Sequence, residues 1–305
     1  MQVDFSKIFT PELYESVRKL YFPWAEDSTL DWTAVAKQYF GGQTASKEWY
    51  DLTFHSVFKP VSKVTVENVP DLMQFLPSPE AEDFPAQAIG LLVLLDQGPR
   101  ILFDGANNRY TYGYFDRLSS KLAHQLLALP PSQSPYSLER LVAQGWSFDY
   151  ALVALIWLTA PLVHAESVEA HQRQTALSDD MRRAVEAHTG TTDPHRATAE
   201  EDSRDIYGFS RVLLVEVPKW ENTRMEVFMY WLLRVFRVHT PIIEKFGGYP
   251  YRNPSLGRIS TPEEEQYLKD TDYFAALTDE EVIKKIRRDV EEGKWSPLED
   301  VPEFS

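Results

Sequence analysis

The sequence contains no cysteine. This absence excludes a thiol nucleophile, a disulfide bond and a zinc site with cysteine ligands. Glycine is also scarce, with 13 residues among 305. These glycines form neither the fingerprint of a nucleotide-binding loop nor the Gly-x-Ser-x-Gly turn of an α/β-hydrolase. No motif therefore indicates nucleotide-dependent or serine-hydrolase chemistry.

Positive charge is in deficit. The chain has 31 Lys and Arg against 46 Asp and Glu, which gives a formal net charge of −15. Such a surface repels phosphate backbones, so nucleic acid is disfavoured as a partner. A neutral or cationic small molecule fits this charge better.

Long hydrophobic runs are missing as well. The most apolar stretch, residues 150–163, is interrupted by Pro161, whereas a membrane span needs about 20 apolar residues. The N-terminal sequence MQVDFSK has no apolar core of a signal peptide. We expect a cytoplasmic protein without membrane segments, and the sequence leaves its oligomeric state open.

What the chain has in abundance is helical patterning. Apolar residues recur at helical spacing, and many of the 20 prolines lie between such stretches. The main expected helices cover residues 84–95, 112–129, 148–162, 168–189 and 222–238. We therefore predict an all-α protein of stacked antiparallel helices in a single domain. Residues 1–46 are expected to form a helical arm packed on a core of residues 47–305.

Local patterns give four further expectations. Thr261 and Thr278 each begin a capping box and should each precede a helix, the second running to Gly293. Residues 211–218 are the most strand-like run, and the alternative is an extended segment that leads into the next helix. Residues 190–204 lack large apolar side chains and are expected to form a mobile loop.

Residues 239–264 are the most unusual segment. The stretch reads HTPIIEKFGGYPYRNPSLGRISTPEE and concentrates histidine, arginine, asparagine and tyrosine between glycines and prolines. Glycines and prolines at this density exclude a regular helix over the whole segment.

Three blocks together resemble the domain-of-unknown-function 924 family, which is a tetratricopeptide-like helical family. The first is LLDQGPRILFDG at 94–105, similar to that family's LLDQFPRNLFRG. The second is PLVHAE at 161–166, similar to PLxHSE, and the third is the segment 239–264. Trp49 belongs to a weaker match with a WWxxD element. The resemblance covers roughly residues 47 to 268 and implies a tetratricopeptide-like fold, but no settled activity.

The resemblance carries over a set of polar residues: Asp96, Gln97, Arg100, His164, Glu166, His239, Arg252, Asn253 and Arg258. Several neighbours differ. Ile101 replaces a family asparagine, Ala165 a serine, Thr240 and Gly248 arginines, and Tyr251 a histidine. Either the site has been adapted to another ligand, or part of a polar network has been lost.

Asp96 and Arg100 stand four residues apart. Pro99 disfavours a helix that continues through this point, so we expect the pair at a helix end. There Asp96 can orient Arg100 as a substrate clamp. The alternative is an ion pair that joins two helices.

His164 and Glu166 follow a core helix and form a minimal acid–base unit. The alternative is a buried histidine bonded to backbone carbonyls. His171 lies seven residues further on, which would allow a two-histidine metal site, but the spacing is poor for zinc and we predict no metal.

His239 is expected at a helix end, kinked by Pro241 so that the ring points into a cavity; alternatively it interacts with the helix dipole. Arg252 and Asn253, between two prolines, are expected either to bind substrate or to tie a loop to helix ends.

The leading functional hypothesis is a cofactor-free enzyme of small-molecule metabolism. His164 would be the acid or base, Glu166 or Asp96 its orienting carboxylate, and His239 a further catalytic candidate. Substrate would be bound by Gln97, Arg100, Tyr251, Arg252, Asn253 and Arg258. One alternative is a peptide-binding or scaffold protein; another is an acyl or aminoacyl transferase, such as an enzyme that forms a cyclic dipeptide. A deep polar pocket favours the enzyme, and a long open groove favours peptide binding.

Overall fold

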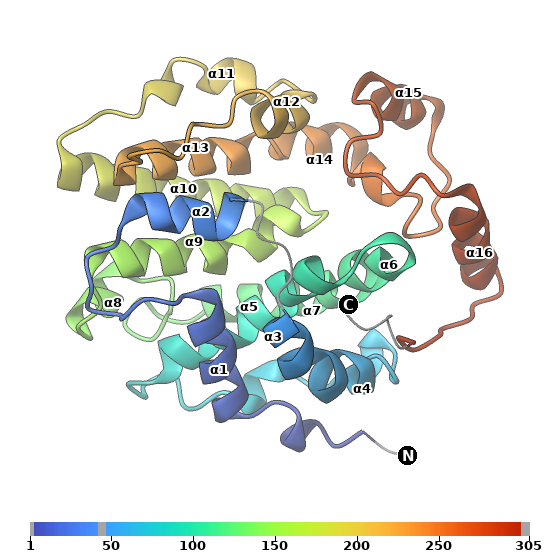
Figure 1. The fold of residues 1–305 in the computed structure, drawn as a ribbon, viewed down its shortest axis with the longest axis horizontal. Coiled ribbons are helices and arrows are strands. Elements are labelled where there is room, and N and C mark those ends of the chain that lie inside the picture. Colours follow the sequence, from blue (N-terminus) through green and yellow to red (C-terminus); the bar gives the residue numbers. More distant parts are fainter. Residues whose placement is uncertain (1–2, 42–46, 300–305) are drawn as a thin grey trace.

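Two apolar helices form the centre of the protein. The computed structural model describes residues 3–41 and 47–299. Helix α5 (Phe84–Leu102) and helix α9 (Phe148–His164) contact each other and are buried along almost their whole length. A helix that is apolar on all sides must lie inside the protein. Helices α1 (Pro11–Tyr21) and α7 (Asp116–Leu127) pack against α5, and α7, α8 (Leu138–Ala143), α10 (Val168–Thr189) and α13 (Met225–Arg237) pack against α9 (Figure 1).

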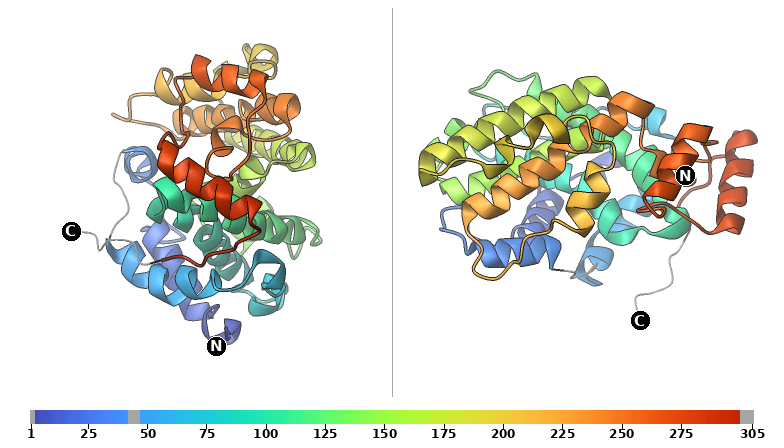
Figure 2. Two further views of the ribbon diagram at one scale, coloured as in Figure 1. Left: turned by 90° about the vertical axis from the view of Figure 1, so that its right-hand side faces the viewer. Right: turned by 90° about the horizontal axis from the view of Figure 1, so that it is seen from above.

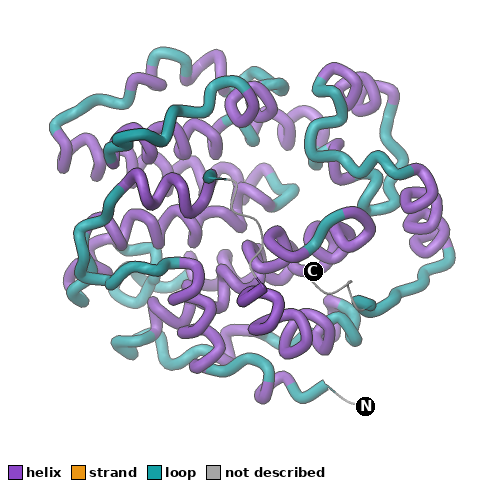
Figure 3. Tube along the Cα trace, viewed as in Figure 1, coloured by secondary structure: helices purple, strands orange, loops and turns teal. Residues whose placement is uncertain are grey.

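All regular secondary structure in the described part of the chain is helical, and no strand occurs there (Figure 3). The prediction of an all-α, single-domain protein is confirmed. The remaining helices up to residue 143 are α2 (Trp32–Phe40), α3 (Lys47–Trp49), α4 (Lys59–Val61) and α6 (Asn108–Tyr110). Those after α9 are α11 (Ala199–Asp202), α12 (Gly208–Leu214), α14 (Thr240–Phe246), α15 (Pro262–Asp270) and α16 (Glu280–Glu291).

Helix α1 lies directly against α5. A Cβ added at Gly90 of α5 would lie 2.3 Å from the backbone oxygen of Tyr14, so only glycine permits this approach. Thr10 caps α1 by accepting a hydrogen bond from the backbone N–H of Leu13, with Pro11 in the first turn, as its sequence predicts. The expected division of the chain after residue 46 falls at residues 42–46, outside the described part.

The helices that follow α9 form a layered stack. Only residues 165–167 separate α9 from α10, and a connection this short places the two helices side by side. Helix α13 packs on the other side of α10, so α5, α9, α10 and α13 succeed one another in space (Figure 1). This order agrees with stacked helices, whereas the tetratricopeptide-like character stays a prediction.

Two of the longer helical stretches contain π-helical turns. Residues 47–61 form one stretch around the π segment Tyr50–Phe58, and residues 108–127 form another around Thr111–Phe115. A π turn rotates the side chains that follow it relative to an α-helix. The second π segment carries Tyr112, which reaches the site described below.

The C-terminal helices α15 and α16 lie at one end of the stack (Figure 2). The capping box predicted at Thr261 is confirmed, because Thr261 and Glu264 exchange side-chain and backbone hydrogen bonds. For α16 the predicted cap is wrong by one residue: Asp279, rather than Thr278, accepts from the backbone of Glu281 and Val282, and the helix ends at Glu291.

The segment 190–204, expected to form a mobile loop, is partly helical, and its mobility stays a prediction. It contains a 3-10 turn and α11, and ion pairs attach it to α10 and α13. Arg234 of α13 binds the fully buried Asp202 through two nitrogens, at 2.9 and 3.1 Å. Arg182 of α10 donates to Asp193 at 2.8 Å. Charged pairs supply here the attachment that apolar side chains supply elsewhere.

The strand-like run 211–218 is not a strand. Its first part belongs to α12, with Val212 fully buried, and its later part is a turn followed by irregular chain. Arg211 bonds to both Asp205 and Glu216, which holds the turn closed. Because Leu214 and Val215 are largely exposed, the run of apolar residues does not mark a buried strand.

No helix among the described residues is long and apolar enough to cross a bilayer.

Candidate active site

Asp96 and His164 form a close pair between α5 and α9. Asp96 is fully buried, and His164 is the last residue of α9. Nδ1 of His164 lies 2.9 and 3.0 Å from the two carboxylate oxygens of Asp96. A carboxylate only accepts hydrogen bonds, so Nδ1 carries the proton and Nε2 of the neutral ring has the lone pair. No group in the described part of the chain hydrogen-bonds to Nε2.

The surroundings keep this pair as an aspartate and a neutral imidazole. Burial lowers the pKa of His164, the positive charge of Arg100 lowers it further, and Asp96 opposes both. Burial alone would raise the pKa of Asp96, but attraction to protonated His164 and to Arg100 outweighs burial and brings that pKa to about 2. At neutral pH Nε2 is therefore available to accept a proton.

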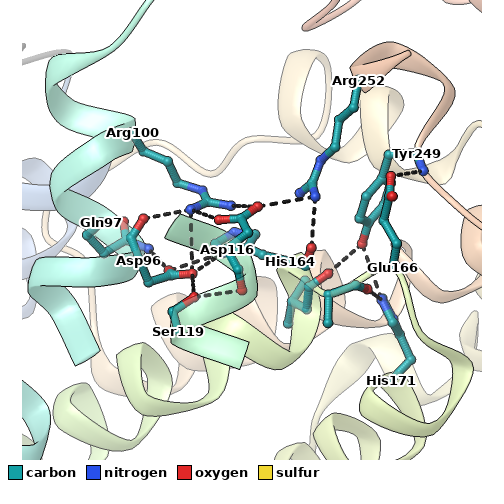
Figure 4. A network of polar contacts seen from close by, with 12 residues as sticks. Asp96, Gln97, Arg100, Asp116, Ser119, His164, Glu166, His171, Tyr249 and Arg252 are labelled. Atoms are coloured by element: carbon teal, nitrogen blue, oxygen red, sulfur yellow. Dashed lines mark hydrogen bonds and ion pairs between the residues drawn. The ribbon is translucent and has the colours of Figure 1, made fainter. Parts of the chain in front are cut away.

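A chain of alternating charges extends from this pair (Figure 4). Arg100 donates to both carboxylate oxygens of Asp116, at 2.7 and 2.9 Å, and to the backbone oxygen of Asp96 at 2.6 Å. Arg252 lies 3.2 Å from the same Asp116 carboxylate. Asp96, Arg100, Asp116 and Arg252 thus bring two negative and two positive charges into the interior without a net charge.

The expectation that Pro99 ends the helix is wrong. Helix α5 continues through Pro99 to Leu102, although proline has no backbone N–H and so cannot bond to the carbonyl of Leu95. Asp96 and Arg100 consequently lie on one helix, with a long contact of 3.5 Å between their side chains. The stronger partner of Arg100 is Asp116 of α7, so an ion pair does join two helices here, but through Asp116 and not through Asp96.

Arg252 is buried among aromatic rings. Its guanidinium carbon lies 4.4 Å from the ring centroid of Tyr249 and 4.6 Å from that of Tyr112. It also donates a 2.9 Å hydrogen bond to the backbone oxygen of His164. Arg252 thereby ties the loop after α14 to the end of α9 that carries the histidine.

Glu166 does not orient His164. Its two oxygens accept from Arg258 at 2.7 and 2.8 Å, and one also accepts from the backbone of Tyr249 at 2.8 Å. Gly248 lies beside this pair, and a Cβ there would come within 3.1 Å of Glu166. Asn253 bonds to Ser260 at 3.2 Å and holds its own loop. Glu166, Asn253 and Arg258 are therefore separate from the Asp96–His164 pair.

His171 and His239 differ in how many of their ring nitrogens form hydrogen bonds. His171 uses both ring nitrogens: Nε2 donates to the backbone oxygen of Ala165, and Nδ1 accepts from Thr240. His239 lies between α13 and α14, and Pro241 begins α14 instead of kinking α13, which corrects the expectation. Its Nδ1 lies 2.7 Å from the carbonyl of Val235. No set of three His, Asp or Glu among the described residues is arranged to hold a metal ion.

A cavity of about 420 Å³ connects several of these groups. Residues from all three sequence blocks line it: Gln97, Arg100, His164, His239, Tyr251 and Arg252. A second hollow of about 430 Å³ adjoins it and shares Tyr112, His164 and Arg252. Hollows of about 510 and 640 Å³ elsewhere in the described structure are lined by no histidine. The cavity of about 420 Å³ is the candidate active site, and we name it the His164 cavity.

Sequence reasoning missed three residues of this site. Asp116 was not singled out because an acidic residue early in a helix is common. Its signal was its spacing, which places it with Ser119 and Ala123 on the buried face of α7. Tyr112 and Tyr249 looked like core aromatics. Among the departures from the family pattern, Thr240 bonds to His171, and Tyr251 lines the cavity.

Acidification is expected to destabilise the protein between pH 6.5 and pH 5. Burial lowers the pKa of His171 to about 4 and also lowers those of His164 and His239. The unfolded chain takes up protons below its ordinary histidine pKa of about 6.5, whereas the folded chain does not, so the free energy of unfolding falls with pH. His171 alone should contribute about 2 kcal/mol to the loss at pH 5.

Urea denaturation at pH 7 and pH 5 measures this loss. His171→Gln should reduce the difference between the two pH values, because glutamine takes up no proton in this range. Equal stability at both pH values would contradict neutral buried histidines.

Comparison with known proteins places the chain in a family. The model of the family described as "Bacterial protein of unknown function (DUF924)" matches residues 24–272. The match contains α5, α9 and the loop after α14, and so every residue of the charge chain. Searches of curated proteins and of solved structures found no match. The chain belongs to the DUF924 family of bacterial proteins of unknown function.

Proposed function

We propose that the protein is a cofactor-free enzyme of small-molecule metabolism in which His164 is the general base. The observation that carries this proposal is the Asp96–His164 pair at the wall of the His164 cavity. Asp96 fixes the proton on Nδ1, and Nε2 remains free to remove a proton from a bound molecule.

The charge chain supports the proposal in a second way. After His164 takes up a proton, the imidazolium lies beside the ionised Asp96, which stabilises it. Arg100 and Asp116 hold Asp96 in place through α5 and α7. The geometry therefore changes little when the charge on the histidine changes, as a preorganised site requires.

The shape of the site favours an enzyme over the scaffold alternative. Side chains from blocks far apart in sequence converge on one cavity of the size that small molecules occupy. A peptide-binding protein would offer a long groove instead.

The experiment is a consumption screen. The purified protein is incubated with a library of metabolites, and the compounds that disappear are identified by mass spectrometry. We expect at least one compound to be consumed by the unsubstituted protein and by a His188→Gln control, but not by His164→Gln. A His164→Gln protein that is folded, as judged by circular dichroism, and consumes the compound at the unsubstituted rate would rule out His164 as the base. Capture of peptides without consumption of any metabolite would favour the scaffold.

A further inference from the structure

The walls of the His164 cavity are mainly apolar and aromatic. They include Phe40, Trp157, Phe209, Leu232, Val235 and Phe236. An aromatic molecule gains most from such walls, because rings stack favourably on rings as well as losing contact with water.

The charged side chains that line the cavity are already neutralised. These are Arg100 and Arg252, and both bind Asp116. An anion would have to compete with Asp116 for these guanidinium groups, and a cation would find no carboxylate among the described lining residues. An uncharged molecule meets neither cost.

His164 and His239 line the cavity, and each imidazole ring has one nitrogen that can accept a hydrogen bond. Nδ1 of His164 donates to a carboxylate, and Nδ1 of His239 donates to the carbonyl of Val235. Because a carboxylate and a carbonyl can only accept hydrogen bonds, Nδ1 of each ring keeps its proton. Nε2 of each ring therefore carries a lone pair. His239 is further held against Phe209, with ring centroids 4.1 Å apart. None of the described residues hydrogen-bonds to Nε2 of His239.

We propose that the His164 cavity binds an uncharged, aromatic molecule with two hydrogen-bond donors, one received by His164 and the other by His239. The inference rests on the proposed function, since it assigns the substrate to the same cavity. His164 would take the proton that is transferred, and His239 would be a specificity-determining residue that selects for the second donor. A molecule without that donor would leave a buried lone pair without a partner, which is unfavourable.

The test uses isomers of dihydroxynaphthalene as probes, because their hydroxyl groups span different distances, and the matching dimethoxynaphthalenes, which lack donors. Affinities are measured by calorimetry. We expect at least one diol to bind at least about ten-fold more tightly than its dimethoxy counterpart. Naphthoate and a naphthylmethylammonium ion should bind more weakly than that diol. A His239→Phe variant should reduce the preference for the diol, and a His188→Phe control should retain it.

His239→Phe also removes the bond to Val235, so a second measurement avoids substitution. The ¹⁵N shift of Nε2 of His239 in the unsubstituted protein should move when the diol binds and stay in place when the dimethoxy compound is added. Equal affinity of every diol and its dimethoxy partner, tighter binding of naphthoate, or an unmoved Nε2 shift would overturn the inference.

Failure here is distinct from failure of the proposed function. Loss of the diol preference, with consumption of a metabolite still dependent on His164, would remove only the assignment of the ligand class. Diol binding through His239, with consumption unaffected by His164→Gln, would remove only the general base.

Discussion

Replacement of Asp116 by asparagine is expected to lower the free energy of unfolding by about 3–5 kcal/mol. Asp116 accepts from Arg100 at 2.7 and 2.9 Å and lies 3.2 Å from Arg252. Without its charge, the buried Arg252 loses the carboxylate 3.2 Å away, and the partly buried Arg100 keeps only its 3.5 Å contact with Asp96. Removing one partner of a buried ion pair leaves a charge without a counter-charge in a poorly hydrated place, and this is far more unfavourable than losing a surface pair.

A matched control distinguishes burial from charge alone. Glu169 pairs with Arg173 on the exposed surface of α10, so Glu169→Gln should change the stability by less than about 1 kcal/mol. Arg252→Gln added to Asp116→Asn restores the balance of charges, and the double variant should recover part of the loss. Urea denaturation measures all three variants. A loss below about 1 kcal/mol for Asp116→Asn would show that the charge chain is not a stabilising element.

The helices were largely predictable because their signals are local. Residues 168–189 form α10 with the predicted bounds, since Ser167 caps one end and Gly190, with a φ of 69°, ends the other. The helix over 148–162 was also predicted, although it continues to His164. Capping residues and apolar spacing act within a few positions, so a single sequence contains them.

The expectations were incomplete or wrong where distant residues decide the structure. The segment 190–204 has few apolar side chains, and only the partners Arg182 and Arg234 on other helices show how it is attached. The same applies to 211–218, whose apolar residues suggested a strand although no neighbouring strand exists in the described structure to pair with it. Sequence spacing does not reveal such partners.

The candidate site was predictable in part for the same reason. Polar residues in apolar or punctuated stretches pointed to Asp96, His164, His239 and Arg252, and these come together. Nothing in the sequence distinguished Asp96 from Glu166 as the partner of His164, because that choice depends on how α5 crosses α9. Arg258 turned out to be the partner that occupies Glu166.

Replacement of Asp96 by asparagine is expected to lower the rate of the proposed reaction about 10²–10⁴-fold. Nδ1 of His164 faces both carboxylate oxygens almost equally. Gln97 donates to one of these oxygens at 2.6 Å, and Arg100 approaches the other at 3.5 Å. When the N–H₂ group of the asparagine faces Nδ1 of His164, Nδ1 must accept a hydrogen bond and carry a lone pair. The proton then moves to Nε2, and His164 can no longer act as the base.

Asp96→Asn also removes a buried negative charge, so lost activity must be separated from lost folding. Arg100→Gln added to Asp96→Asn leaves Asp116 paired with Arg252, and the interior is again without net charge. This double variant should regain part of the stability but none of the activity. Because Arg100 also lines the cavity, stability is the readout of this double variant, and the tautomer of His164 decides whether Asp96 positions the base.

The tautomer itself can be measured in the folded variants. In ¹⁵N spectra of the unsubstituted protein, Nδ1 of His164 should be protonated and Nε2 should not, and Asp96→Asn should exchange the two. Asp96→Asn combined with His164→Gln should be no slower than His164→Gln alone, because the two residues act as one unit. Full activity of a folded Asp96→Asn protein, or an unchanged tautomer, would show that Asp96 holds α5 in place without positioning the base.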